Sequence, residues 1–369
     1  MKRKIYLGIF FLVLFLASTT LSYLWGIYKN IYVDSKALAN SKVEAKVSVS
    51  PTPTPDPLGP KDILILGYGG PGHEGGLLTD TILIAHIRPR DNSITLISIP
   101  RDVAIYLPVT RDKSEYLKVN HAYAIGTDHK NYPDKPIEYL NEAGGGNLAK
   151  YAVNLITGLQ IDYFVSVNFV GFTNIINTLG GISVNVPYTF EDKFYPLKGL
   201  ENELCGKSEE EIKVLTATLS GEFLEKEFPC RYETIKYVKG VQVMDGETAL
   251  KFVRSRHSEI GGGDFARAQR QQALIVALKN KLLSYKSIPK IISVINTASK
   301  NVLTDIDFKS GFDLLNDYGE LKDLKIKTVT LTTDNVLEEV VVNRQYVLVP
   351  KGGQDNWEVI HQYIKENLN

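Results

Sequence analysis

The stretch ILILGYGGPGHEGGLLTDTILIAHIRPRDNSITLISIPRD, residues 63–102, decides the fold. It contains three short apolar runs bounded by glycine, proline or asparagine, a pattern typical of buried strands. We expect these strands at residues 63–66, 81–87 and 93–99. Helical patterns alternate with strands in the rest of the chain. The sequence therefore predicts an α/β domain with a mixed central sheet, in three layers of helix, sheet and helix.

Charged residues flank the three strands at one end. If the second strand pairs antiparallel with both the first and the third, the glycine-rich loop and the end of the third strand share one edge of the sheet. Functional sites are commonly built on loops at such an edge. Asp80 is the best candidate there for a Mg²⁺ ligand, although a turn or cap role explains it equally well. The edge collects five side chains: His73, Glu74, Asp80, Arg101 and Asp102.

Glycines and helical patterns continue the domain beyond these strands. We expect a flexible break at residues 144–146, where three glycines follow one another. An amphipathic helix is expected at residues 147–159, and strands are expected at residues 162–168 and 182–186.

Arginines are concentrated in a second charged stretch, RSRHSEIGGGDFARAQRQQ, residues 254–272. Each guanidinium can bind a phosphate or carboxylate with two nitrogens. The charge balance of the whole chain argues against an ordinary basic surface. The stretch contains four arginines: Arg254, Arg256, Arg267 and Arg270.

The second half of this stretch is expected to open a helix with two kinds of side chain on one face. Residues three and four apart are neighbours on a helix. Such a face fits a core helix that reaches the rim of the domain. It also fits a pocket with a charged mouth and an apolar floor, suited to a phosphate on a lipid. The residues that share it are Arg267, Arg270, Gln271, Leu274, Leu278 and Leu282.

Composition excludes some functions. The chain has 369 residues, with 42 basic and 42 acidic side chains and a net charge of zero. Because general nucleic-acid binding relies on a basic footprint, a nucleic-acid partner is not expected. The two cysteines, Cys205 and Cys230, lack the spacing of a zinc site. In an oxidising compartment they could form one disulfide.

The N-terminus predicts a membrane anchor. Three basic residues, Lys2 to Lys4, precede an uncharged, mostly apolar run at residues 5–28 that is long enough to span a bilayer. A cleaved signal peptide is the alternative, but its apolar region is usually shorter. The basic residues place the N-terminus in the cytoplasm and the rest of the chain outside, in a single-pass protein of the cell membrane.

The domain boundaries follow from the same pattern. Residues 1–28 are expected to form a cytoplasmic stub and a transmembrane helix. Residues 29–60 are expected to be a flexible linker rich in proline and threonine. Residues 61–369 are then expected to form one extracytoplasmic domain, in which residues 188–239 look like an insertion.

Seven motifs, in matching order, resemble the LytR–CpsA–Psr family from about Asp62 to the C-terminus. They are LTDT (residues 78–81), SIPRD (98–102), KVNHAYA (118–124), DYFVSVNFVGF (162–172), LGGISVNVP (179–187), MDGETALKFVRSRH (244–257) and GDFARAQRQQ (263–272). The resemblance implies an enzyme of bacterial cell-envelope assembly, a phosphotransferase. It would move a glycopolymer from an undecaprenyl pyrophosphate carrier to a peptidoglycan sugar hydroxyl, with Mg²⁺ as cofactor.

The resemblance also implies roles for individual residues. The metal ligand and catalytic aspartate of the family falls on Asp80. The other residues expected to be catalytic are Arg101, Arg254, Arg256, Arg267 and Gln271. We expect substrate binding to involve Arg101, Lys118, Asn120, Arg254, Arg256, Arg267, Arg270 and Gln271, with Leu274 and Leu278 towards the prenyl chain.

Two positions depart from the family pattern. The family usually has an aspartate just after the first strand, at a position that falls near Tyr68 in this chain, and an arginine where this chain has Leu78. The loop at His73 and Glu74 offers a replacement, and we expect Glu74 to be the second metal ligand. Two alternative functions remain. Hydrolysis of a polyprenyl pyrophosphate would use the same residues, whereas the absence of the first aspartate favours non-catalytic glycopolymer binding or regulation at the membrane.

Overall fold

The computed structural model describes residues 22–23, 25–35, 56, 58–73, 75–219, 221–258, 260, 262–282, 291–316, 324–342 and 345–368. The chain forms two compact units. Unit 1 comprises the chain up to Thr178 together with Pro289–Asn369, and unit 2 comprises Leu179–Ile288. The predicted membrane span at residues 5–28 lies mostly outside the described residues. Among the residues that are described, no helix has the length and apolar character needed to cross a bilayer.

Unit 1 is built on a six-stranded sheet in the order β11-β6-β1-β2-β3-β12. β2 pairs antiparallel with both β1 and β3, which is the condition under which the sequence places Asp80 and Arg101 at one edge of the sheet. β1 pairs parallel with β6, and β3 pairs parallel with β12. The prediction of a mixed central sheet is therefore confirmed. The strands are β1 (Lys61–Tyr68), β2 (Thr79–Arg88), β3 (Ser93–Ser98), β6 (Tyr163–Asn168), β11 (Val302–Thr304) and β12 (Lys325–Thr330).

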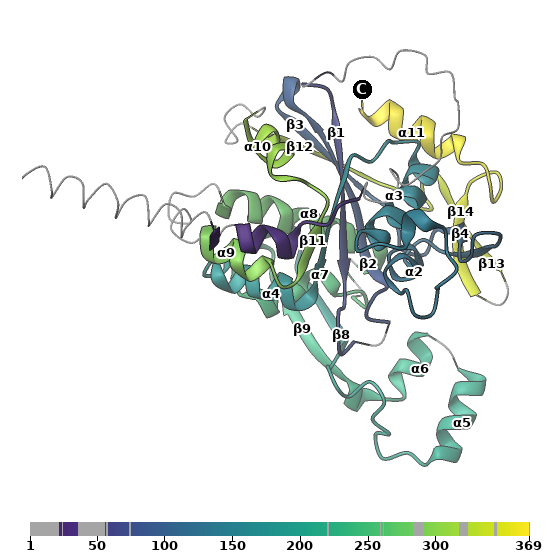
Figure 1. Ribbon diagram of the computed structural model, residues 1–369. Coiled ribbons are helices and arrows are strands. Elements are labelled where there is room, and N and C mark those ends of the chain that lie inside the picture. Colours follow the sequence, from purple (N-terminus) through teal and green to yellow (C-terminus); the bar gives the residue numbers. More distant parts are fainter. Residues whose placement is uncertain are drawn as a thin grey trace, which may run out of the picture. The chain divides into compact units, whose positions relative to one another are not determined.

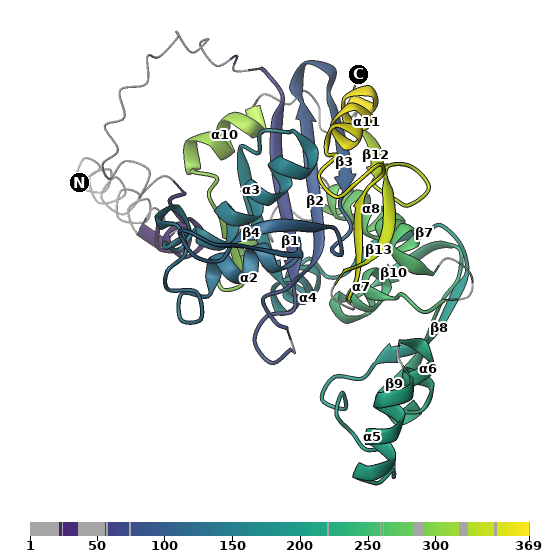
Figure 2. The same ribbon diagram turned by 90° about the vertical axis from the view of Figure 1, so that its right-hand side faces the viewer.

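Helices flank this sheet on both sides (Figures 1 and 2). α2, α3 and α11 lie on one side, and α4 and α9 lie on the other. The described part of unit 1 also contains two hairpins, β4–β5 and β13–β14, and the helix α10. These elements are α2 (His121–Thr127), α3 (Gly144–Thr157), α4 (Phe169–Thr178), α9 (Ile291–Ala298), α10 (Phe308–Asn316), α11 (Glu358–Leu368), β4 (Ala104–Pro108), β5 (Ser114–Lys118), β13 (Leu337–Val342) and β14 (Gln345–Pro350).

The expectation of a flexible break at residues 144–146 is wrong. All three glycines are buried and form the first turn of α3. A Cβ at Gly146 would lie 2.2 Å from the ring of Phe164, and a Cβ at Gly144 would lie 2.2 Å from the carbonyl oxygen of Tyr139. The glycines are therefore explained by the close approach of the helix to its neighbours.

A buried ion pair fixes α3 to the sheet of unit 1. Lys150 Nζ on α3 lies 2.5 Å from Asp305 Oδ2, and the Asp305 side chain is 1% exposed. The second carboxylate oxygen of Asp305 accepts a hydrogen bond from the backbone N–H of Phe164 on β6, at 2.7 Å. One carboxylate thus holds a helix and a strand together.

Replacing Lys150 with methionine should lower the free energy of unfolding by about 3 kcal/mol, because it leaves the Asp305 carboxylate buried without its cation. Urea denaturation followed by circular dichroism measures this change. Lys309→Met is the matched control, since Lys309 and its partner Asp313 form an exposed pair. Equal unfolding midpoints for Lys150→Met and the wild type would show that the pair is not structural.

The described residues of unit 2 form two antiparallel strand pairs and four α-helices. β7 pairs with β10, and β8 pairs with β9. The long helix α8 packs against both β7 and α7. The elements are β7 (Ile182–Val186), β8 (Phe190–Pro196), β9 (Tyr232–Tyr237), β10 (Gly240–Met244), α5 (Glu209–Thr218), α6 (Glu222–Lys226), α7 (Gly246–Arg254) and α8 (Gly263–Leu282).

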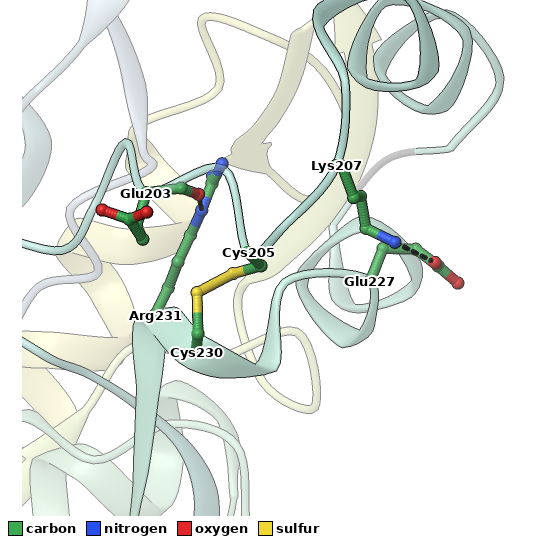
Figure 3. The surroundings of a disulfide bond; sticks show 6 residues. All are labelled: Glu203, Cys205, Lys207, Glu227, Cys230 and Arg231. Atoms are coloured by element: carbon green, nitrogen blue, oxygen red, sulfur yellow. Dashed lines mark hydrogen bonds and ion pairs between the residues drawn. A yellow bond between two sulfur atoms is a disulfide. The ribbon is translucent and has the colours of Figure 1, made fainter.

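A disulfide closes the segment between β8 and β9, which we call the disulfide lobe (residues 197–231; Figure 3). Cys205 and Cys230 are bonded, with their Cα atoms 5.6 Å apart and 25 positions apart in sequence. At the neck of the lobe, the N–H of Leu197 donates to the carbonyl of Arg231 at 2.8 Å. Arg231 Nε in turn donates to the carbonyl of Glu203 at 2.7 Å. The sequence leaves open whether the two cysteines pair, and the structure shows that they form a disulfide.

Removing the disulfide with Cys205→Ser and Cys230→Ser together should make the lobe open more readily, since closing a loop of this length is worth about 3 kcal/mol. We expect faster proteolytic cleavage within residues 197–231 than in the oxidised wild type. Wild-type protein treated with a reductant should be cleaved as fast as the variant. The reductant should not change the cleavage rate of the variant itself. Equal cleavage rates in all samples would contradict a stabilising role.

Candidate functional site

Asp80 stands on an irregularity in the β1–β2 pairing. Gly67 pairs with Thr81 and Tyr68 pairs with Thr79, so Asp80 is left without a partner on β1. A β-bulge of this kind redirects the side chain of the extra residue and is common beside active sites. The Asp80 side chain is 32% exposed and therefore reachable by a ligand.

Four charged side chains form a network, which we call the ion cluster, at this end of the sheet in unit 1. An Nη of Arg101 donates to Asp80 Oδ1. Arg101 Nε also lies 3.6 Å from Asp102 Oδ2, and Lys118 Nζ lies 2.6 Å from Asp102 Oδ1. The prediction that Asp80, Arg101 and Asp102 meet at one edge is confirmed.

The charges of the ion cluster alternate in sign and sum to zero. The side chains of Asp80, Arg101 and Lys118 are 24–32% exposed. Ion pairs that water reaches are worth about 1 kcal/mol or less. A more highly charged anion can therefore displace the carboxylates from Arg101 and Lys118 at little cost.

Asn120 ties the backbone segments of the ion cluster together. Its carbonyl accepts from the N–H of Thr79 at 3.2 Å, and its own N–H donates to the carbonyl of Arg101 at 3.4 Å. The residue is 5% exposed. Its side-chain Oδ1 is buried and has no hydrogen-bond partner among the described residues. The backbone of Asn120 thus positions the ion cluster.

The position near Tyr68, where the family usually has an aspartate, is closed in this chain. Tyr68 is buried, and its ring centroid lies 5.1 Å from that of Tyr123. At the next residue, Gly69, an added Cβ would come within 2.9 Å of the Cβ of His73. His73 therefore fills the space in which a side chain at residue 69 would project. Glu74, the expected second metal ligand, lies outside the described residues.

In unit 2, a buried carboxylate supports the segment that we call the arginine loop (residues 254–258). Asp192 on β8 is fully buried. Its Oδ2 accepts hydrogen bonds from Ser255 Oγ at 2.7 Å and from the N–H groups of Arg256 and His257 at 3.0 and 3.1 Å. Its Oδ1 accepts from the N–H of Phe194 at 3.0 Å. Asp192 therefore fixes the backbone that carries Arg254 and Arg256.

Arg270 supports the arginine loop from α8. It is fully buried, with one Nη donating to the Tyr188 hydroxyl at 3.1 Å and the other donating to the carbonyl of Ser255. Its guanidinium also lies over the ring of Phe190, 4.7 Å from the centroid. Burial lowers the pKa of Arg270, but a guanidinium remains charged at neutral pH. These contacts give Arg270 a structural role in holding the arginine loop.

The other predicted residues of unit 2 differ in exposure. Arg254 donates to the Tyr195 hydroxyl at 3.2 Å, and burial raises the pKa of that tyrosine. Arg267 is 7% exposed, and Gln271 is half-buried. The apolar end of α8 begins with buried Leu274 and continues to half-buried Leu278 and exposed Leu282. The charged and apolar parts of one helix face are thus present, as the spacing predicts.

Three residues that support the arginine loop were not found from the sequence. Tyr188, Asp192 and Tyr195 lie in or beside the polar segment that looked like an insertion. The one available signal was the alternation of Phe190 and Asp192, which places an acidic side chain on the inward face of a strand.

Comparison with known proteins agrees with the motifs. The model of the LytR_cpsA_psr family matches residues 25–359. The chain is 27% identical over 313 residues to the polyisoprenyl-teichoic acid–peptidoglycan teichoic acid transferase TagV of Bacillus subtilis, covering 84% of this chain and 65% of TagV. It is also 26% identical over 343 residues to TagU of Enterococcus faecalis, which is named as a transferase of the same kind. This match covers 90% of this chain and 91% of TagU.

A solved structure shares the fold. The crystal structure of B. subtilis TagV matches with a TM-score of 0.53 and 26% identity, covering 84% of this chain and 98% of that chain. Because TagV and TagU are named as transferases, the prediction that the chain is a transferase is confirmed. The match over most of the chain shows that it belongs to the LytR–CpsA–Psr family.

Proposed function

We propose that the chain transfers a glycopolymer from an undecaprenyl-pyrophosphate-type lipid carrier to a sugar hydroxyl of peptidoglycan. The observation that carries this proposal is the ion cluster: Arg101 and Lys118 present two cations beside Asp80 and Asp102 at one end of the sheet. Positioned cations beside carboxylates are what phosphoryl transfer requires, because catalysis there is mostly charge neutralisation and alignment. The named activities of TagV and TagU support the same reaction.

In the proposed reaction, the acceptor hydroxyl oxygen bonds to the phosphorus nearest the glycan. The bond from that phosphorus to the bridging oxygen breaks, and the prenyl monophosphate leaves. Arg101 and Lys118 exchange their carboxylate partners for phosphate oxygens. Asp80 and Asp102 are then the two carboxylates able to accept the hydroxyl proton. Arg254, Arg256, Arg267 and Gln271 of unit 2 are proposed to bind the substrate, with Arg270 and Asp192 fixing the arginine loop.

We propose Mg²⁺ as the cofactor, with Asp80 as a ligand. Within the described part of the chain, no group of three or more acidic, histidine or cysteine side chains could hold a metal ion. Mg²⁺ commonly takes one or two carboxylates and completes its shell with substrate phosphates and water, so the single carboxylate of Asp80 fits it. When bound, the ion would neutralise phosphate charge. Glu74 remains our proposal for a second ligand.

We further propose that residues 1–28 anchor the chain in the cell membrane, with the N-terminus in the cytoplasm and the domain outside. The support is the basic residues Lys2 to Lys4 ahead of the apolar run. The disulfide between Cys205 and Cys230 also favours an oxidising, extracytoplasmic setting. The polyprenyl carrier and the peptidoglycan acceptor would both be available at that surface.

Replacing Asp80 with asparagine and Arg267 with glutamine tests whether these residues carry the activity. We expect polymer attachment to be lost in cells that depend on this chain, while the protein level in the membrane remains normal. Because Arg267 is buried, Asp80→Asn alone provides a second variant that should fold. Unchanged attachment with both residues replaced would overturn the proposed function.

A further inference from the structure

A pair of tyrosines continues the ion cluster along the β4–β5 hairpin of unit 1. In this antiparallel pair, Ala104 lies opposite Lys118, and Tyr106 lies opposite Tyr116. Side chains two positions apart on a strand share a face, so Lys118, Tyr116 and Tyr106 lie on the same side of the hairpin. Two residues of a strand span about 7 Å, which places the tyrosine pair about that far from Lys118.

The rings of Tyr106 and Tyr116 form an aromatic surface that is partly exposed to solvent. Their centroids are 5.0 Å apart and their planes are inclined by 53°. Tyr116 packs against the buried side chains of Ala104, Val347 and Val349, and burial raises its pKa to about 12. Tyr106 remains 50% exposed. A fixed, neutral ring thus supports a second ring that water still reaches.

We propose that Tyr106 and Tyr116 form a sugar subsite that binds the first sugar of the glycopolymer on its diphosphate carrier. The inference rests on the proposed function, since it takes the ion cluster as the diphosphate site. A pyranose has an apolar face of C–H groups that gains from contact with an aromatic ring, and hydroxyls at its rim that remain in water. The first sugar is bonded directly to the diphosphate, so it must lie within one sugar length of the phosphates. The tyrosine pair lies next to Lys118 along the hairpin, in that range.

The chain provides a comparison for this pair. Tyr139 and Tyr151 form another tyrosine pair in unit 1, with centroids 6.4 Å apart, and Tyr151 on α3 is 41% exposed. That pair is not part of the β4–β5 hairpin that leads from the ion cluster. The Tyr106–Tyr116 pair differs from it because it shares a face of the hairpin with Lys118.

Calorimetric binding of two probes to the full chain tests the subsite. The probes are farnesyl diphosphate and farnesyl diphosphate carrying N-acetylglucosamine. We expect the wild type to bind the sugar-bearing probe about tenfold more tightly, an effect that corresponds to the burial of one sugar face. Tyr106→Ala should abolish this preference and leave the Kd for farnesyl diphosphate unchanged. Tyr106→Phe, which retains the ring, should keep most of the preference.

Tyr151→Ala is the matched control and should retain the full preference. A tenfold preference that persists in Tyr106→Ala would overturn the subsite. An equal loss of affinity for both probes in Tyr106→Ala would also overturn it, because the ring would then be contacting the lipid or the diphosphate. Wild-type binding without any preference would remove the sugar subsite and leave the proposed function standing. If the wild type binds neither probe, both proposals fall.

Discussion

Replacing Arg101 with glutamine is expected to lower the rate of polymer transfer about a thousandfold, because it removes a positioned cation from the phosphoryl group. Arg101 is the one residue of the ion cluster that contacts both Asp80 and Asp102. Arg101→Lys should recover only part of the rate, since an ammonium cannot contact two groups with the fixed fork of a guanidinium. The measurement is the initial rate of polymer attachment by the purified full chain.

Arg90→Gln is the matched control for this prediction. Arg90 is an exposed arginine that lies 2.6 Å from Asp56, and its loss should leave the rate unchanged. A rate for Arg101→Gln within twofold of the wild type would mean that the ion cluster does not serve the reaction.

Replacing Asp192 with asparagine should reduce transfer at least tenfold and lower the free energy of unfolding by about 3 kcal/mol. The asparagine amide can present only one oxygen, whereas both carboxylate oxygens of Asp192 accept N–H or O–H donors. One N–H would then face another donor in a fully buried position. The arginine loop should lose its fixed conformation. Denaturant unfolding and transfer rates, measured on folded protein, check the two effects.

Asp245→Asn is the control for Asp192→Asn, because it makes the same chemical change in unit 2. Asp245 caps α7 by accepting from the N–H of Thr248 at 2.8 Å. Asparagine caps a helix about as well as aspartate, so this variant should match the wild type. Equal behaviour of Asp192→Asn and Asp245→Asn would show that the arginine loop does not need its buried carboxylate.

The parts of the fold that depend on local pattern could be predicted from the sequence. Apolar runs bounded by glycine, proline or asparagine predicted the strands β1, β2 and β3. Antiparallel pairing of these strands places Asp80 near Arg101. Helical spacing correctly grouped Arg267, Arg270 and Leu274 on one face of α8, all of them buried. These features follow from side chains that are close in sequence.

Features that depend on long-range packing were missed. The irregular pairing at Asp80 arises from the register between two strands, which no local pattern specifies. The bond from Asp192 to the arginine loop joins residues 63 positions apart. The glycines at residues 144–146 looked like a break because the side chains that crowd them, such as Phe164, lie elsewhere in the sequence.

One reaction in which two products are counted together tests the proposed glycopolymer transfer. Purified full chain is supplied with a glycopolymer on a prenyl diphosphate, with or without peptidoglycan. We expect polymer attached to peptidoglycan and prenyl monophosphate released in equal amounts, and neither product when peptidoglycan is omitted. Release of prenyl monophosphate at the same rate without peptidoglycan would show a hydrolase, and the absence of both products in the complete reaction would contradict enzymatic transfer.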